Sequence, residues 1–242
     1  MVMSNWKTFG ASVRGPGHMR SGLPNQDALK TYRNTWGDVA VVSDGVGSLR
    51  TSEYGSKAAC RAVLRAARHW TQMDDERTER LLAEIHQNWL AEVEPFIPEE
   101  SSATCLFVIR PKQGRIVVGM LGDGLAAVIR TDGSYEELID NKEDNFSNQT
   151  AALSRETKIS HWKTLFMDQD ECCAVVLCTD GVADDLLPEK RSDFVRNLYE
   201  QGQNFAVVTL VRGVRKMLEN WPVPKHSDDK TLVCMCRQRE GI

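Results

Sequence analysis

The sequence predicts an α+β fold in which two antiparallel β-sheets pack against each other and pairs of helices flank them, an α-β-β-α sandwich. Apolar strand-like segments are interrupted by two helix pairs, one in the first half of the chain and one near its end. This order lacks the regular strand–helix alternation of a parallel doubly wound sheet and is typical of antiparallel sheets with helices on their outer faces. No repeat or low-complexity linker divides the 242 residues, so we expect one domain over residues 1–242.

The strands are expected where apolar runs are bounded by Gly, Pro or Asn, residues that favour turns. Three of them lie in the opening part of the chain, three follow the first helix pair, and one lies on each side of the last pair. The expected strands are Phe9–Val13, Ala28–Tyr32, Val39–Ser43, Thr104–Ile109, Ile116–Leu121, Leu125–Arg130, Ala174–Cys178 and Thr231–Cys236.

The helices are expected where apolar residues recur on one face. The first begins near Thr51 or Ser52, either of which can cap it, and its apolar face ends at Trp70. The second is stopped by Pro95 and Pro98, because proline has no N–H to donate within a helix. Two closing helices are expected at about residues 188–200 and 204–220.

Two connecting segments carry signals of their own. The run Thr131-Asp132-Gly133-Ser134 predicts a tight hairpin turn, because Asp-Gly readily adopts the positive φ angles that such a turn needs. Residues 140–170 are polar and irregular, and they predict a surface flap.

Composition and charge exclude several classes of partner. The chain carries 30 Lys and Arg against 34 Asp and Glu, a net charge of −4, which argues against nucleic acid or an anionic membrane as its main partner. No apolar run approaches the ~18 residues that a membrane span needs. The start, MVMSNWKTFG, lacks both a basic leader and an apolar segment, so we expect a cytoplasmic protein.

The seven cysteines are expected to act as small core residues rather than as disulfides or zinc ligands. Most lie inside apolar runs, and no C-x-x-C pair is matched by a second pair or by a histidine cluster. A redox switch at the adjacent Cys172 and Cys173 is the alternative. The full set is Cys60, Cys105, Cys172, Cys173, Cys178, Cys234 and Cys236.

One pattern recurs along the chain: an apolar strand ends in aspartate, and glycine follows at once. It occurs in VAVVSDGVGS, VVGMLGDGLA and AVVLCTDGVA, at Asp44, Asp123 and Asp180. A single Asp-Gly pair after a strand is also an ordinary turn. Two further acidic sites, Asp27 before an early strand and Asp228-Asp229 before the last one, make a shared acidic cluster the better interpretation.

Such a cluster indicates a metal site. Carboxylates packed together repel, and burying them unpaired is costly, so a divalent cation relieves both problems. No histidine or cysteine stands at these strand ends, which favours Mg²⁺ or Mn²⁺ over zinc or copper. Two cations that share a carboxylate can activate water and stabilise in-line attack on phosphorus.

At these residues the chain resembles the metal-dependent serine/threonine protein phosphatases of type 2C, the PPM family. The resemblance covers about residues 8–236. The pattern H-x-x-S-G-x-P-N/C-Q-D-A and a flap motif, here FSNQT, are similar to a compact bacterial branch of that family. The motifs that follow the family's order are NQDA around Asp27, SDGVGS around Asp44, SATCLF around Thr104, LGDG around Asp123, TDGVADDL around Asp180 and DDKTLV around Asp228.

The resemblance implies a fold and an activity. The fold is the sandwich predicted above, and the activity is hydrolysis of phosphoserine and phosphothreonine by water activated at two divalent cations, Mn²⁺ or Mg²⁺. It also implies the following roles: Asp44 bridges the two cations, the Gly45 carbonyl binds the second, Asp180 and Asp228 complete the first, Asp27 holds cation-bound waters, and Asp123 with Asp180 holds a weaker third cation.

The chain departs from the family pattern at two positions. Many members carry a phosphate-binding Arg where this chain has Gly22, and many carry a His where it has Val46. His18 and Arg20, in GPGHMRSG, are the candidates to bind phosphate instead, and His18 is also a candidate to protonate the leaving oxygen. A plain packing role in the loop stays open for both.

The expected partner is a phosphoprotein substrate. Asn148 and Thr150 of the flap motif are predicted to contact it, and the resemblance adds a partner kinase. The alternative function is a catalytically weak or inactive regulatory protein on the same fold. The sequence has no D-x-D-G-T, Walker or H-E-x-x-H motif, which disfavours other metal-dependent phosphoesterases.

Overall fold

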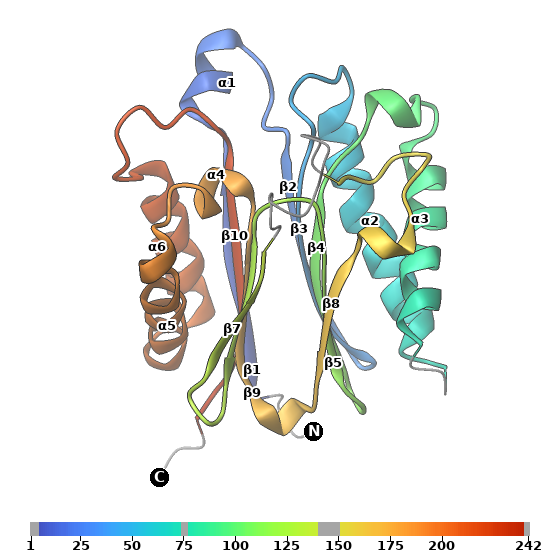
Figure 1. Ribbon diagram of the computed structural model, residues 1–242. Coiled ribbons are helices and arrows are strands. Elements are labelled where there is room, and N and C mark those ends of the chain that lie inside the picture. The colour runs from blue at the N-terminus through green and yellow to red at the C-terminus, as the bar shows by residue number, and fades with distance from the viewer. Residues whose placement is uncertain (1–4, 74–76, 140–150, 240–242) are drawn as a thin grey trace.

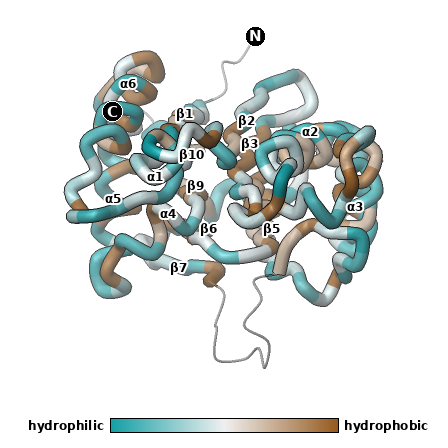
Figure 2. Tube along the Cα trace, turned by 90° about the horizontal axis from the view of Figure 1, so that it is seen from above, coloured by the Kyte–Doolittle hydropathy of each residue, from teal (hydrophilic) through white to brown (hydrophobic). Residues whose placement is uncertain are grey.

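A computed structural model describes residues 5–73, 77–139 and 151–239. Two five-stranded antiparallel sheets pack face to face, and a helix pair covers the outer face of each (Figure 1). Figure 2, viewed from above, shows the two helix pairs on opposite sides of the strands. The predicted α+β sandwich is therefore confirmed.

The first sheet has the strand order β1-β10-β9-β6-β7 and the second has the order β2-β3-β4-β5-β8. The strands of the first sheet are β1 (Trp6–Val13), β10 (Lys230–Arg237), β9 (Cys172–Cys178), β6 (Leu125–Arg130) and β7 (Tyr135–Leu138). Those of the second are β2 (Asp27–Asn34), β3 (Gly37–Asp44), β4 (Cys105–Pro111), β5 (Ile116–Leu121) and β8 (Lys163–Met167).

The helices lie where the sequence places them, with two short additions. The helices α2 (Ser52–Trp70) and α3 (Thr78–Val93) cover the second sheet, and α5 (Pro188–Asn204) and α6 (Val207–Glu219) cover the first. Short helices α1 (Pro16–Ser21) and α4 (Asp180–Ala183), and 3₁₀ turns at Pro98–Glu100, Ile159–His161 and Gln169–Glu171, complete the chain. Among the described residues, no helix combines the length and the apolar character needed to cross a membrane.

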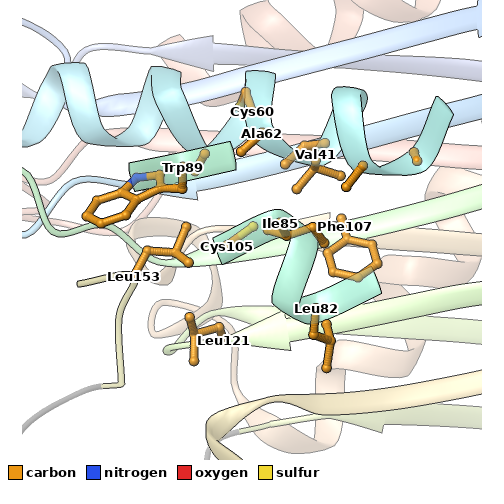
Figure 3. Close-up of a cluster of buried hydrophobic side chains, with 14 of the residues drawn as sticks. Val41, Cys60, Ala62, Leu82, Ile85, Trp89, Cys105, Phe107, Leu121 and Leu153 are labelled. Atoms are coloured by element: carbon orange, nitrogen blue, oxygen red, sulfur yellow. The ribbon is translucent and has the colours of Figure 1, made fainter. Parts of the chain in front are cut away.

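Three apolar layers hold the sandwich together. One lies between the sheets and includes Val42, Leu106 and Val175. The other two lie between each sheet and its helices, and Figure 3 shows the one in which Trp89 and Ile85 of α3 pack towards Phe107. Central strands are thus covered on both faces, which explains why they are continuous apolar runs in the sequence rather than alternating ones.

The cysteines belong to these layers. All seven are free thiols, and all except the half-buried Cys173 are buried. Burial raises the pKa of the Cys172 thiol to about 12, which makes it a poor nucleophile. The structure therefore supports the core interpretation over a redox pair at Cys172 and Cys173.

The prediction of an irregular flap over residues 140–170 is wrong in its second half. Strand β8 (Lys163–Met167) pairs there with β5 at the edge of the second sheet. Its sequence, KTLFM, has only three apolar residues in a row, and an edge strand has a neighbouring strand on one side only. Asn148 and Thr150 lie outside the described residues, so their predicted contact with substrate stays a prediction.

The predicted Gly-rich loop around His18 is also corrected. Residues Pro16–Ser21 form the helix α1, with Pro16 in its first turn and Gly22 ending it in the left-handed region at φ 72°. Proline fits the first turn because no helical partner is available for an N–H there. Gly22, where many members of the resembled family carry arginine, thus has a backbone conformation that disfavours any side chain.

Candidate metal centre

The acidic residues singled out in the sequence come from both sheets and gather at one end of the sandwich, where α1 and α4 lie (Figure 1). Asp27 is the first residue of β2 and Asp44 the last residue of β3, and the two are direct partners in the antiparallel pairing. Directly opposite residues share a face of the sheet, so their side chains approach one another.

The backbone holds Asp44 firmly. Its N–H donates to Thr104 Oγ1 at 2.9 Å, and its carbonyl accepts the N–H of Thr104 at 2.8 Å. Gly45 follows in a crowded turn, where an added Cβ would lie 2.5 Å from the carbonyl oxygen of Ser52. Thr104 belongs to the predicted motif SATCLF, and its two hydrogen bonds to Asp44 hold the end of β3 in place.

Asp180 and Asp123 lie at the ends of other strands. Asp180 follows β9 as the first residue of α4, and its Oδ1 accepts the N–H of Gly181 at 2.6 Å. Asp123 is half-buried in the turn that leads from β5 in one sheet to β6 in the other. Thr179 links the two sheets here, because its hydroxyl donates to Asp27 Oδ2 at 2.8 Å.

Asp228 and Asp229, just before β10, differ in exposure and in their contacts. Asp228 is exposed and accepts the N–H of Asp229 at 2.9 Å. Asp229 is 1% exposed and accepts three hydrogen bonds, from the N–H groups of Gly15 and Gln26 at 2.6 Å each and from His18 Nδ1 at 2.9 Å. Asp229 therefore ties the α1 region and the start of β2 to the acidic end. The sequence pointed to the pair but assigned no role to this member.

The acidic side chains perturb one another. Burial raises the pKa of Asp44 well above its ordinary value, and the neighbouring charges of Asp27, Asp180 and Asp228 raise it further. Burial raises the pKa of Asp180 to about 7, with added contributions from Asp123, Asp228 and Asp27. The pKa of Asp27 rises to about 6, again through burial, although hydrogen bonds from Asp44, Thr231 and Thr179 oppose part of the rise. These effects require the carboxyl groups to be near neighbours.

The donor set fits a hard divalent cation. Every one of these side chains offers carboxylate oxygen, the ligand that Mg²⁺ and Mn²⁺ prefer. Asp27 and Asp44 place two carboxyl groups at facing positions, and a bound cation would relieve the repulsion between their charges. Within the described residues, however, no three His, Cys, Asp or Glu side chains already close around a common point.

The candidates for phosphate binding are separated by the structure. His18 is held at the acidic end by its hydrogen bond to Asp229, and its side chain is 19% exposed. Arg20 lies at the exposed end of the same short helix. Val46, where many family members carry histidine, donates its N–H to the Ser102 carbonyl at 3.0 Å.

Comparison with known proteins supports the reading of these motifs. The family model described as protein phosphatase 2C matches residues 14–221. No curated protein sequence is significantly similar to this chain.

Solved structures share the fold at low identity. A bacterial serine phosphatase has a TM-score of 0.66 and 16% identity, with 98% of this chain and 99% of that chain covered. The catalytic domain of the serine/threonine protein phosphatase PstP, in complex with two manganese ions, has a TM-score of 0.61 and 16% identity over 97% and 99%. RsbX in complex with magnesium has a TM-score of 0.62 and 14% identity over 96% and 94%.

Proposed function

Because this chain belongs to the protein phosphatase 2C family, a family of phosphoprotein phosphatases, we propose that it hydrolyses phosphoserine and phosphothreonine in proteins with the help of divalent cations. The observation that carries the proposal is that Asp27 and Asp44 lie directly opposite each other on β2 and β3, with Asp180 near enough for its charge to raise the pKa of Asp44. Each comes from a different chain segment, and the protein supplies no basic residue among the main causes of their raised pKa values. A site that keeps uncompensated carboxylates together is suited to cations.

The residues divide the work as follows. Asp44 would be shared by two cations, with the Gly45 carbonyl on one of them, while Asp180 and Asp228 would complete the other. Asp27 would orient water through its carboxylate, which Thr179 already holds at 2.8 Å. When bound, Mn²⁺ or Mg²⁺ supplies the positive charge that activates water and stabilises the transferring phosphoryl group. Asp123, with Asp180, would hold a weaker third cation.

His18 is the residue that this chain offers to the phosphate or the leaving oxygen. A carboxylate can only accept, so the contact with Asp229 Oδ2 makes Nδ1 the donor and fixes the ring orientation. The Nε2 nitrogen is then the one available to substrate. Arg20 is the less favourable candidate, because it is exposed and makes no such hydrogen bond to an acidic residue among those that the structure describes.

The choice of two cations, and of Mn²⁺ or Mg²⁺, is supported by the ions named for PstP and RsbX, which share the fold. The donor chemistry of the chain agrees, since its carboxylates are hard oxygen ligands. The phosphoprotein substrate is set by the family, and a partner kinase stays a prediction from the sequence.

The test is phosphate release from p-nitrophenyl phosphate and from a phosphothreonine peptide, with Mn²⁺, with Mg²⁺ and with EDTA. We expect turnover with either metal and none with EDTA. Asp193→Asn removes an exposed carboxylate on α5, outside the acidic end, and should release phosphate as wild type does. A folded protein that releases no phosphate from either substrate with either metal would instead support the regulatory alternative.

A further inference from the structure

A cavity of about 400 Å³ lies beside the candidate metal centre. The end of β1, the helix α1, the helix α6 and the segment before β10 contribute its walls. These parts are joined directly: the N–H of Gly17 donates to the Ser227 carbonyl at 2.8 Å, and a Cβ on Gly15 would lie 2.3 Å from the backbone of Asp228. The cavity is thus built into the packing of four segments.

The cavity adjoins the acidic end through shared residues. A second cavity, of about 250 Å³, is lined by Asp180 and Gly181 of the candidate centre. Asp228, His226 and Lys230 line both cavities. A peptide whose phosphorylated residue lies at the centre would therefore have a neighbouring residue within reach of the larger cavity.

The charges on its walls favour an anionic side chain. Arg14 and Arg215 contribute two guanidinium groups, and Arg215 makes no hydrogen bond or ion pair within the described part of the chain. Nδ1 of His226 is buried there without a hydrogen-bond partner among the described residues. Lys230 is already compensated by Asp185 at 2.9 Å. Glu219 and Asp228 are the acidic residues of these walls. In the proposed function a bound cation balances the charge of Asp228, which leaves Glu219 against the two arginines.

The same walls also offer apolar surface. Pro16, Met19 and Leu218 line the cavity, and Met19 is 51% exposed. The aliphatic part of a side chain can pack on these residues while its charged end reaches a guanidinium group, whose planar fork matches a carboxylate.

We propose that this cavity is a specificity subsite that binds an acidic residue, Asp or Glu, near the phosphorylated residue of the substrate protein. The inference rests on the proposed function for the position of the substrate. It adds the class of sequence that the enzyme prefers and names Arg215 as a residue that sets the preference.

The test measures binding, so that it does not depend on turnover. Two fluorescein-labelled peptides carry a phosphonate analogue of phosphoserine, which is not hydrolysed, flanked by Glu in one and by Lys in the other. Their dissociation constants are measured by fluorescence anisotropy with Mn²⁺, for wild type, Arg215→Glu and Lys216→Glu. Lys216 is the matched control, because it is the exposed next residue of α6 and does not line the cavity.

We expect wild type and Lys216→Glu to bind the Glu peptide about threefold to tenfold more tightly than the Lys peptide, and Arg215→Glu to reverse that order. Equal affinities in wild type, no binding of either peptide, or the same reversal in Lys216→Glu would overturn the subsite. Loss of phosphate release from ordinary substrates, with this binding preference intact, would count against the proposed function alone.

Discussion

Two aspartates on β3, the buried Asp38 and the half-buried Asp44, have opposite surroundings at the two ends of that strand. Asp38, near its start, accepts hydrogen bonds from Arg33 Nε at 2.8 Å and from Arg110 at 2.7 Å. Asp44, at its end, lies opposite Asp27, and burial together with the charges of nearby carboxylates raises its pKa. The same strand therefore holds one carboxylate that the protein compensates and one that it does not.

The register of neighbouring strands produces this difference. Arg33 lies directly opposite Asp38 on β2, and Arg110 lies directly opposite it on β4. Six residues along β3, the same pairing with β2 sets Asp44 against Asp27. Opposite charges at facing positions stabilise a sheet and like charges destabilise it. The arginine end thus balances its charge within the protein, whereas the acidic end has no basic partner at the facing position, which is why we propose that a cation binds there.

The largest expected effect lies at the compensated end. Asp38→Asn removes one partner of a buried ion pair and leaves Arg110, which is 8% exposed, without its counter-charge. We expect the free energy of unfolding in urea to fall by about 3 kcal/mol. The Mn²⁺-dependent activity per folded molecule should stay at the wild-type level, because Asp38 is at the far end of the strand from the acidic cluster.

The matched control for this variant is Asp193→Asn, at an exposed ion pair on α5. Its unfolding free energy should lie within about 0.5 kcal/mol of wild type. If Asp38→Asn were equally harmless, the arginines would not be compensating a buried charge, and the contrast between the two ends would disappear.

The second effect lies at the acidic end and has the opposite character. Asp44→Asn removes one of several mutually repelling carboxylates, so the metal-free protein should be at least as stable as wild type. Its activity at saturating Mn²⁺ should fall at least about tenfold, a loss of about 1.4 kcal/mol or more in transition-state stabilisation. Steady-state kinetics on p-nitrophenyl phosphate measures this loss. A variant that retained more than about a tenth of wild-type activity would remove Asp44 from the bridging role.

The acidic end and the sandwich itself could be predicted from the sequence. Asp44, Asp123 and Asp180 could be found because each ends an apolar run that forms a buried strand, with glycine next in the chain. The sandwich could be found because its central strands are covered on both faces and therefore read as continuous apolar segments. Both signals are local in the sequence.

The features that could not be predicted from the sequence depend on contacts between distant segments. The compensation of Asp38 by Arg33 and Arg110 requires the register of three strands. The role of Asp229 requires hydrogen bonds to residues more than 200 positions away. Strand β7, with the sequence YEEL, gives no strand signal either, because a half-exposed edge strand needs no apolar run.

A smaller effect is expected in the pH dependence of stability without metal. The folded-state pKa values of Asp27 and Asp180 are raised to about 6 and about 7, so the folded protein binds more protons than the unfolded chain between about pH 4 and pH 7. The stabilising effect of this protonation is present at low pH and is lost as pH rises through the raised pKa values. The free energy of unfolding in EDTA should therefore be higher at pH 5 than at pH 7.5.

The reference for that measurement is Asp44→Asn in the same buffers. Asp44→Asn removes a carboxyl group whose own pKa is raised by burial, so one group fewer takes up a proton on folding. The loss of stability between pH 5 and pH 7.5 should therefore be smaller than in wild type. A wild-type protein that became more stable over this range, with Asp44→Asn following the same curve, would show that the acidic cluster does not control the pH dependence.

The most direct test of the account is calorimetric titration of Mn²⁺ into EDTA-stripped wild type, Asp38→Asn and Asp44→Asn at pH 7.5. The acidic end should bind cations, so wild type and Asp38→Asn should give the same binding curve. Asp44→Asn should bind Mn²⁺ at least about tenfold more weakly, a loss of about 1.4 kcal/mol in binding free energy. If wild type took up no Mn²⁺, or if Asp44→Asn matched it, the acidic end would not be a metal centre and the central claim would be contradicted.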